Sequence, residues 1–313
     1  MRRAVIDLGT NTFHLFIVEI NDKSLTSLYR EKIAVKIGQN GISKGRIAKD
    51  AIKRALHTLK VFKTVIDQFG VTEVCGVATS AIRNAKNGQE LIDEIKSTTG
   101  ISIDIISGDS EAELIFKGVR AAMDMGNTNH LAMDIGGGSV EFIIGNQQDI
   151  LWKQSFEIGA QRLLDKFHKH DPMPKESVDD MFTFFKTELS ELLEAITKYQ
   201  PEAIVGCSGT FDTLCEIYRK EQEIEEKGNG TTYNLPIKHY RDIHRELLIK
   251  NKAQRLEIPG MVSMRVDMIV VASCLISFVT EYLPVDEIIA SSYALKEGLL
   301  YEKERKPIAQ ELS

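Results

Sequence analysis

The feature that most constrains this chain of 313 residues is a segment that occurs twice. Residues 131–146 align without a gap on the opening of the chain, 127 residues earlier. In this alignment Asp134 falls on Asp7, Gly136 on Gly9, Ser139 on Thr12 and Glu141 on His14. Each copy is rich in β-branched residues around one glycine-containing turn, which is typical of strand, tight turn and strand. A gapless recurrence at the start of two domain-sized segments indicates an internal repeat.

Patterns typical of strands and of helices alternate after each copy of the hairpin. Such alternation predicts an α/β architecture in both halves. The expected helices include residues 47–69, 110–123, 175–199, 265–282 and a last one at about 293–305, and residues 101–107 are expected to form a strand. Because the length exceeds what one hydrophobic core supports, we expect two domains, residues 1–125 and 126–313.

Composition and charge exclude several classes of protein. A hydrophobic content of 43% and a net charge of −6 argue against disorder, collagen and a coiled coil. An acidic chain without a basic face is a poor candidate for nucleic-acid binding. The longest apolar run, residues 268–279, is too short to span a bilayer, and the start lacks a signal peptide. The four cysteines show no metal or disulfide spacing, which is typical of a protein in the reducing cytoplasm. From charge, apolar runs and cysteines together, we expect a cytoplasmic protein that binds neither nucleic acid nor membrane.

The repeated turns carry groups that suit a phosphate chain. Glycine-rich turns expose backbone N–H groups that bind phosphate oxygens, and the hydroxyls of Thr10, Thr12 and Ser139 add donors. An acid at the strand end before each turn, Asp7 or Asp134, can hold Mg²⁺. Two such turns facing one another would bind a phosphate chain from both sides. The alternative is a pair of ordinary β-hairpins.

A third glycine turn, residues 206–210, follows an apolar strand and opens a helix. That arrangement is typical of an anion site, although a plain helix start is the alternative. A basic stretch at residues 29–54 is either a solvated face or a path that steers a polyanion. We favour an ion pair between Arg265 and Asp267, with contact to a ligand as the alternative, and we interpret His14 as a packing or hydrogen-bonding residue.

The order of motifs resembles the exopolyphosphatase / guanosine pentaphosphate phosphohydrolase (Ppx/GppA) family of the actin-like ATPase superfamily. The blocks that carry the resemblance are DLGTNTFHL, ATSAIRNAKN, ISGDSEAELIFKGV, MDIGGGSVEFIIG, GCSGTFDTL, IPGMVSMRVDMI and ASSYALKEGLL. They cover nearly the whole chain. The resemblance implies two ribonuclease-H-like (actin-like ATPase) domains with the active site in the cleft between them. It leaves open whether the last helix packs back on the first domain.

The resemblance also assigns roles to residues. Glu111 is the implied general base, and Asp7, Asp134 and Glu141 are the implied ligands of Mg²⁺ or Mn²⁺. The expected phosphate-binding residues are Gly9, Thr10, Asn11, Thr12, Arg83, Gly136, Gly137, Gly138, Ser139, Gly209 and Thr210. Judged from the residues alone, Glu111 is more typical of a solvated acid that the dipole at a helix start favours, and the role of general base rests on the resemblance.

The chain departs from the family pattern in three places. Ser110 stands where many members have a second acid before the base, and Val140 stands where a threonine is usual. The sequence given also stops where many members continue into helical domains. The first two departures put rate and metal affinity in question, and the third puts long-chain processivity in question.

These observations predict a phosphohydrolase that releases terminal phosphate from inorganic polyphosphate, guanosine pentaphosphate or both. One alternative is a sensor that binds such a ligand without turnover. Another is a small-molecule kinase of the same superfamily. A homodimer is compatible with the sequence but not indicated by it.

Overall fold

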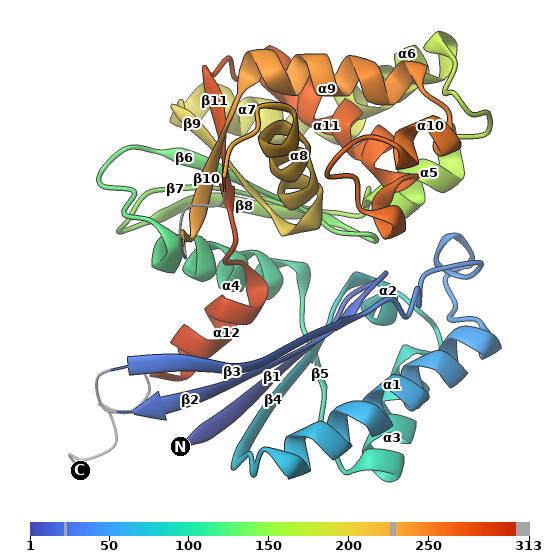
Figure 1. Ribbon diagram of the computed structural model, residues 1–313, viewed down its shortest axis with the longest axis vertical. Helices are drawn as coiled ribbons and strands as arrows, with labels where there is room; N and C mark the ends of the chain where they lie inside the picture. The colour runs from blue at the N-terminus through green and yellow to red at the C-terminus, as the bar shows by residue number, and fades with distance from the viewer. Residues whose placement is uncertain (22–23, 226–229, 305–313) are drawn as a thin grey trace.

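The computed structural model describes residues 1–21, 24–225 and 230–304. Each half of the chain contains one β-sheet (Figure 1). The first sheet has the order β3-β2-β1-β4-β5, with β1 antiparallel to β2 and parallel to β4. Its strands are β1 (Arg2–Leu8), β2 (Phe13–Asn21), β3 (Ser24–Ile33), β4 (Glu73–Ala78) and β5 (Asp104–Ile105).

Helices cover the face of the first sheet that is turned away from the second half (Figure 1). They are α1 (Lys49–Gln68) and α3 (Gly88–Thr99), whereas α2 (Ser80–Arg83) lies at the end of β4 that faces the second half, and a 3-10 turn spans Ile42–Lys44. α1 forms because its apolar residues recur every three or four positions and make one stripe. The buried members of that stripe are Ala51, Ala55, Leu59, Phe62 and Ile66.

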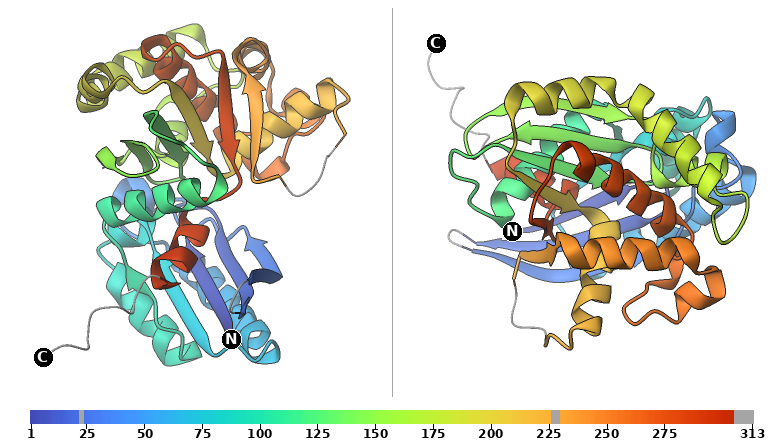
Figure 2. Two further views of the ribbon diagram at one scale, coloured as in Figure 1. Left: turned by 90° about the vertical axis from the view of Figure 1, so that its left-hand side faces the viewer. Right: turned by 90° about the horizontal axis from the view of Figure 1, so that it is seen from above.

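The second sheet has the order β10-β11-β9-β6-β7-β8. Its strands are β6 (His130–Ile135), β7 (Val140–Gly145), β8 (Ile150–Phe156), β9 (Ala203–Cys207), β10 (Thr232–Pro236) and β11 (Glu287–Ser291). Its helices are α5 (Ala160–Phe167), α6 (Lys175–Glu188), α7 (Ser190–Tyr199), α8 (Ser208–Glu221), α9 (Ile237–Ile249), α10 (Lys252–Leu256) and α11 (Met268–Tyr282), with a 3-10 turn at Ser263–Arg265. Most of these helices share one large core with the sheet, on the face away from the first half (Figure 2).

The two hairpins have the same register, as the repeat in the sequence predicts. In the first hairpin Asp7 pairs with His14, and in the second Asp134 pairs with Glu141. The expected α/β architecture, with the repeated hairpin in each sheet, is therefore confirmed.

A layer of two helices lies between the sheets. α4 (Gly108–Ala122) packs against β6, β7 and β8 of the second sheet, whereas α12 (Leu295–Glu304) packs against α4 and against β1 of the first (Figure 1). Side chains from both sheets and both helices form one apolar cluster. The two helices approach closely because Gly118 faces the Ala294 carbonyl and Gly298 faces the Leu114 carbonyl.

Several elements are shorter than the sequence pattern indicates. The helix expected at 175–199 is divided at the buried Leu189 into α6 and α7. The helix expected at 265–282 begins at Met268, after the 3-10 turn. The strand expected at 101–107 is reduced to β5, which pairs only with the end of β4. The last helix begins at Leu295, and position 305, where we expected it to end, lies outside the described residues.

Within the described ranges, none of the helices combines the length and the apolar character needed to cross a membrane.

The contact between α4 and α12 yields a stability prediction. A Cβ atom at Gly298 would overlap the backbone oxygen of Leu114, so Gly298→Ala must push the two helices apart. We expect the free energy of unfolding to fall by about 1–3 kcal/mol, measured by urea denaturation. Gly230→Ala is the control, because a Cβ there meets nothing closer than 3.6 Å and should change stability by less than about 0.5 kcal/mol. Equal effects of the two changes would contradict this account of the helix pair.

Candidate active site

Strand alternation decides which face of each hairpin the acids occupy. On β1, Ala4, Ile6 and Leu8 point into the core beneath α1, whereas Val5 points into the layer between the sheets. Successive side chains alternate, so Asp7 shares the face of Val5. The second hairpin repeats the pattern: Asp134 lies on the face of Ala132, and Glu141 on the face of Ile143. The acids of both hairpins are therefore turned toward the space between the two halves.

A cavity of about 300 Å³ lies between the two hairpins. It is lined by both glycine turns and by residues from β3, α4, α8 and α12. Of the residues predicted from the sequence, the lining includes Asp7, Gly9, Thr10, Asn11, Thr12, Glu111, Asp134, Gly136, Gly137, Gly138, Ser139, Glu141 and Gly209. The structure thus brings together residues that are up to about 200 positions apart in the chain.

The carbonyl oxygens of both turns are occupied by neighbouring backbone. In the second turn, Gly136, Gly137 and Gly138 accept hydrogen bonds from the first N–H groups of the α5 region, residues 159–161, at 2.9–3.1 Å. In the first turn, residues 10 and 11 accept from N–H groups at residues 36 and 38. A planar trans peptide points its N–H opposite to its C=O, so the following amides face away from these partners. Both turns thereby have the form of an anion-binding concavity.

The two turns also touch one another. A Cβ atom on Gly137 would collide with Asn11, and one on Gly138 would lie 2.5 Å from Ser80 Oγ and 2.7 Å from Thr10 Oγ1. Glycine is required at these positions by close approach between the halves. The cavity is therefore assembled from both halves at once.

In the third glycine turn, residues 206–210, Ser208 and Gly209 line the cavity, whereas Thr210, which we expected to bind phosphate, does not. Ser208, in a left-handed conformation with φ of 69°, donates its hydroxyl to Asp134 Oδ1 at 2.5 Å. Gly209 lies directly against the guanidinium of Arg265. Thr210 is buried in the first turn of α8 and does not line the cavity.

The acids of the hairpins are held in an environment that disfavours their charge. Burial, with a contribution from Asp134, raises the pKa of Asp7 to about 6. Burial and the charge of Asp134 raise the pKa of Glu141 to about 7. Burial raises the pKa of Asp134 despite its bond from Ser208. The buried Oδ1 of Asp7 has no hydrogen-bond partner among the described residues.

Glu111 lies in the first turn of α4 and is buried. Ser107 caps this helix by accepting from the Ser110 N–H, and the Ser110 hydroxyl lies 2.9 Å from that of Ser107. Arg83 Nη1 donates to Glu111 Oε2 at 2.8 Å. Burial and the charge of Glu141 raise the pKa of Glu111, and Arg83 opposes them. Buried carboxyls with a raised pKa occur at catalytic sites and also in structural ion-pair networks.

The hydroxyl that Val140 lacks is supplied from the neighbouring strand. Val140 is fully buried, whereas Ser155 on β8 donates to Glu141 Oε1 at 2.7 Å.

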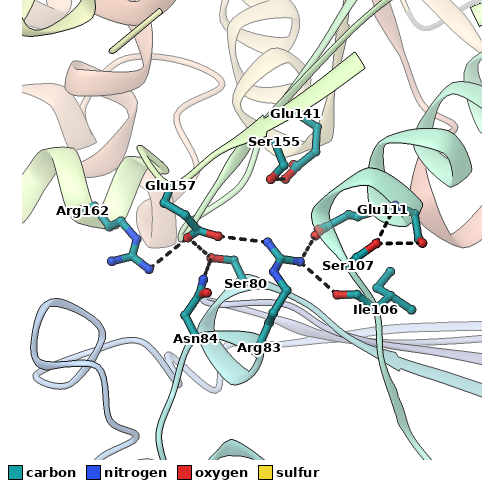
Figure 3. Close-up of polar contacts among 11 residues, drawn as sticks. Ser80, Arg83, Asn84, Ile106, Ser107, Glu111, Glu141, Ser155, Glu157 and Arg162 are labelled. Carbon is teal, nitrogen blue, oxygen red and sulfur yellow. Dashed lines mark hydrogen bonds and ion pairs between the residues drawn. The ribbon is translucent and has the colours of Figure 1, made fainter. Parts of the chain in front are cut away.

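Arg83 does not line the cavity, although the sequence placed it among the phosphate-binding residues. Its guanidinium lies between Glu111 and Glu157, which follows β8 in the other half (Figure 3). The two carboxylates hold the guanidinium from opposite sides, and its contact with phosphate stays a prediction.

The expected ion pair between Arg265 and Asp267 is wrong. Asp267 instead pairs with Lys252 at 2.6 Å. Arg265 lines the cavity instead. Burial lowers the pKa of its guanidinium, and the nearby carboxylates of Asp212 and Asp134 oppose this shift.

The basic stretch divides into two groups in the structure. Lys32 and Lys36 line the cavity, and burial lowers the pKa of Lys32 to about 8. Arg54, by contrast, donates to the carbonyls of Val35 and Lys36 and is structural. His14 hydrogen-bonds Thr12 at 3.0 Å, and burial lowers its pKa to about 2, so it is neutral.

Sequence reasoning missed several residues of the site. They are Ser155, Glu157, Ser208, Asp212 and Lys296. Ser208 belongs to the third glycine turn, and Asp212 lies one helical turn beyond it, so helical spacing could have indicated both. No local pattern indicated Lys296, which α12 carries into the cavity from the far end of the chain.

No three His, Cys, Asp or Glu side chains of the described segments are grouped so that they could hold a metal ion between them.

The sequence matches the model of the Ppx/GppA phosphatase family over residues 16–307. The chain belongs to the Ppx/GppA phosphatase family. A bifunctional 3-dehydroquinate synthase/phosphatase of Fusobacterium nucleatum is 33% identical to it over 96% of this chain and 46% of the relative. A guanosine-5'-triphosphate,3'-diphosphate pyrophosphatase of Photobacterium profundum is 27% identical over 96% of this chain and 58% of the relative. The chain thus spans about half the length of the curated relatives it matches.

Solved structures of Ppx/GppA proteins match over nearly the whole chain. An exopolyphosphatase from Cytophaga hutchinsonii is 46% identical, with a TM-score of 0.94 over 97% of both chains. The Ppx/GppA member from Aquifex aeolicus is 27% identical, with a TM-score of 0.81 over 98% of this chain and 99% of that one. The expected α/β fold with one sheet in each half is therefore confirmed as that of the Ppx/GppA family.

The buried acids give a prediction about pH. The folded pKa values of Asp7 and Glu141 lie above the ordinary 3.8 and 4.5. The folded protein then binds more protons than the unfolded chain between about pH 4 and 7, so these groups reduce stability as the pH rises through that window. In chelator, Asp7→Asn should raise the free energy of unfolding at pH 8 by on the order of 1–3 kcal/mol, with little effect at pH 4. Thermal unfolding at both pH values tests this.

The control for that change is Asp93→Asn, which alters an exposed carboxylate on α3. It should leave the free energy of unfolding within about 0.5 kcal/mol at both pH values. If Asp7→Asn lowers the free energy of unfolding equally at pH 4 and pH 8, the negative charge of Asp7 does not destabilise the folded protein.

Proposed function

We propose that the protein hydrolyses the terminal phosphoanhydride bond of inorganic polyphosphate, guanosine pentaphosphate or both, with the help of Mg²⁺ or Mn²⁺. The observation that carries the proposal is the position of Glu111, a buried carboxyl held by Arg83 at the wall of a cavity made by two glycine turns. The similarity to an exopolyphosphatase of Cytophaga hutchinsonii and to a guanosine-5'-triphosphate,3'-diphosphate pyrophosphatase of Photobacterium profundum supports it.

The turns suit the substrate's phosphates. Amides of both turns and the hydroxyls of Thr10, Thr12 and Ser139 are donors for phosphate oxygens on opposite walls of one cavity. Lys32, Lys36 and Lys296 add positive charge to the lining. Phosphoryl transfer depends chiefly on such positioning and charge stabilisation.

The acids fit a hard divalent cation. Asp7, Asp134 and Glu141 offer the oxygen ligands that Mg²⁺ prefers, and Asp7 Oδ1 is buried without a partner. Mg²⁺ usually keeps several waters and binds through one or two carboxylates plus substrate phosphates, so a closed protein cage is not needed. When bound, the cation would neutralise charge on the transferring phosphoryl group.

The remaining requirement is the activation of a water molecule, and we assign this role to Glu111. Its carboxylate orients a water molecule and accepts its proton as the water oxygen attacks the terminal phosphorus. The bond to the bridging oxygen breaks, and the shortened chain leaves with the electron pair. Arg83 favours the ionised form of Glu111, in opposition to burial and to the nearby Glu141, which raise its pKa. The turn amides and hydroxyls hold the spectator phosphates during this displacement.

Phosphate release on a panel of substrates tests the proposal. We expect release from polyphosphate of some length, from guanosine pentaphosphate, or from both, that is abolished by excess chelator and restored by Mg²⁺ or Mn²⁺. Full activity in chelator would overturn the metal assignment. Binding without turnover would favour a sensor, and release only in the presence of an acceptor would favour a kinase.

Substitution of the base gives a sharper prediction. Glu111→Gln keeps the shape of the side chain but removes the proton acceptor, so kcat should fall by about 10²–10⁴-fold while substrate affinity changes little. Single-turnover rates and titration calorimetry separate the two effects. Glu113→Gln is the matched control, because Glu113 is on the same helix but pairs with Lys153 outside the cavity. A Glu111→Gln protein with the wild-type rate would mean that another group is the base.

A further inference from the structure

The network around Arg83 crosses from one half of the protein to the other. Arg83 ends α2 in the first half, and its Nη1 donates to Glu111 Oε2 at 2.8 Å and to the Ile106 carbonyl at 3.2 Å. Its Nη2 donates to Glu157 Oε1, in the second half, at 3.1 Å. Figure 3 shows the guanidinium lying between the two carboxylates.

Glu157 is itself held in place by the second half and by α2. Its Oε2 accepts from Arg162 Nη2 at 3.0 Å and from Ser80 Oγ at 2.7 Å. Arg162 Nε in turn donates at 2.8 Å to the carbonyl of Gly138, in the second glycine turn. Polar contacts therefore run without a break from that turn, through Arg162, Glu157 and Arg83, to Glu111.

The Arg83–Glu111 end of this path differs in its energetics from a surface ion pair, whereas the side chain of Glu157 is 40% exposed. The side chain of Arg83 is 16% exposed and that of Glu111 8%, so their attraction is only weakly screened. A guanidinium on a flexible stem needs contacts on both sides to keep one orientation, and fixing such a side chain costs up to about 2 kcal/mol of rotamer entropy. Glu157 provides the contact on the side opposite Glu111.

We propose that Glu157 is a positioning residue, which fixes Arg83 across the cleft and so couples closure of the two halves to the placement of Glu111. This inference rests on the proposed function, because it takes Glu111 to be the base. When the halves separate, Glu157 moves away with the second half, and Arg83 keeps only its contacts with Glu111 and the Ile106 carbonyl on the other side of the guanidinium. The base is then held correctly only while the phosphate turns are also together.

Kinetics of Glu157→Ala provide the first test. Misplacement of the base should lower kcat by about 10- to 100-fold. KM should stay within about threefold, because Glu157 does not line the cavity. The matched control is Glu113→Ala, which removes a carboxylate paired with Lys153 between α4 and β8, away from the cavity, and should leave both constants unchanged. An unchanged kcat in Glu157→Ala overturns the inference.

A double-mutant cycle separates positioning through Arg83 from general destabilisation. If Glu157 acts through Arg83, then Glu157→Ala should have no further effect on kcat in an Arg83→Ala protein. Glu157→Gln, which keeps one carbonyl acceptor, should restore part of the lost rate and serves as the second variant if the alanine protein does not fold. An equal loss of kcat in both backgrounds would show that Glu157 acts by another route.

The coupling can be measured without turnover, which separates this inference from the proposed function. Labels at the exposed residues Lys60 on α1 and Lys186 on α6 report the distance between the halves. Without substrate, Glu157→Ala should lengthen or broaden that distance relative to wild type and Glu113→Ala. A wild-type protein that releases no phosphate would defeat the proposed function alone, whereas an unchanged distance would overturn the coupling.

Discussion

Burial of like charges in one cavity is the constraint on which the rest of this structure depends. Asp7, Glu111, Asp134 and Glu141 converge there, and burial raises the pKa of each. Such a group of acids is tolerated only if nearby donors and cations offset part of the repulsion. Hydroxyls donate to Glu141 and Asp134, while Arg83 donates to Glu111. The proposed divalent cation and its phosphate would complete this compensation.

The same constraint explains why the site needs both halves. Strand alternation turns the acids of each hairpin toward the other sheet, so neither half can surround them alone. The helices between the sheets are arranged accordingly: α4 places Glu111 beneath the second sheet, and α12 brings Lys296 from the second half to the first. Contacts as close as those of Gly137 and Gly138 with the first turn fix the relation of the two halves at the cavity.

The sequence predicted the structure correctly where residues close together in the chain determine it. The repeat predicted both hairpins, their register and the acids and glycines that they place in the cavity lining, because a turn and its flanking strands are specified by neighbouring residues. It failed where a side chain chooses between distant partners. The pairing of Arg83 with Glu111 and Glu157 was not predicted, and Asp267 pairs with Lys252 rather than Arg265. Lys296 and Glu157 carry no local signal, because their surroundings exist only after the two halves have met.

The place of α12 also affects how the chain can acquire its structure during synthesis. Arg3 Nη1 donates to the carbonyl of Leu300, 297 positions later, and the apolar cluster beneath β1 is completed by Leu295, Leu299 and Leu300. At ribosomal rates of about 5–20 residues per second, β1 waits for about 15–60 s before its covering helix exists. Throughout that interval Val5 and Phe16 present an uncovered apolar face, which is the kind of surface that chaperones bind. The cavity can therefore become complete only after Lys296 has left the ribosome.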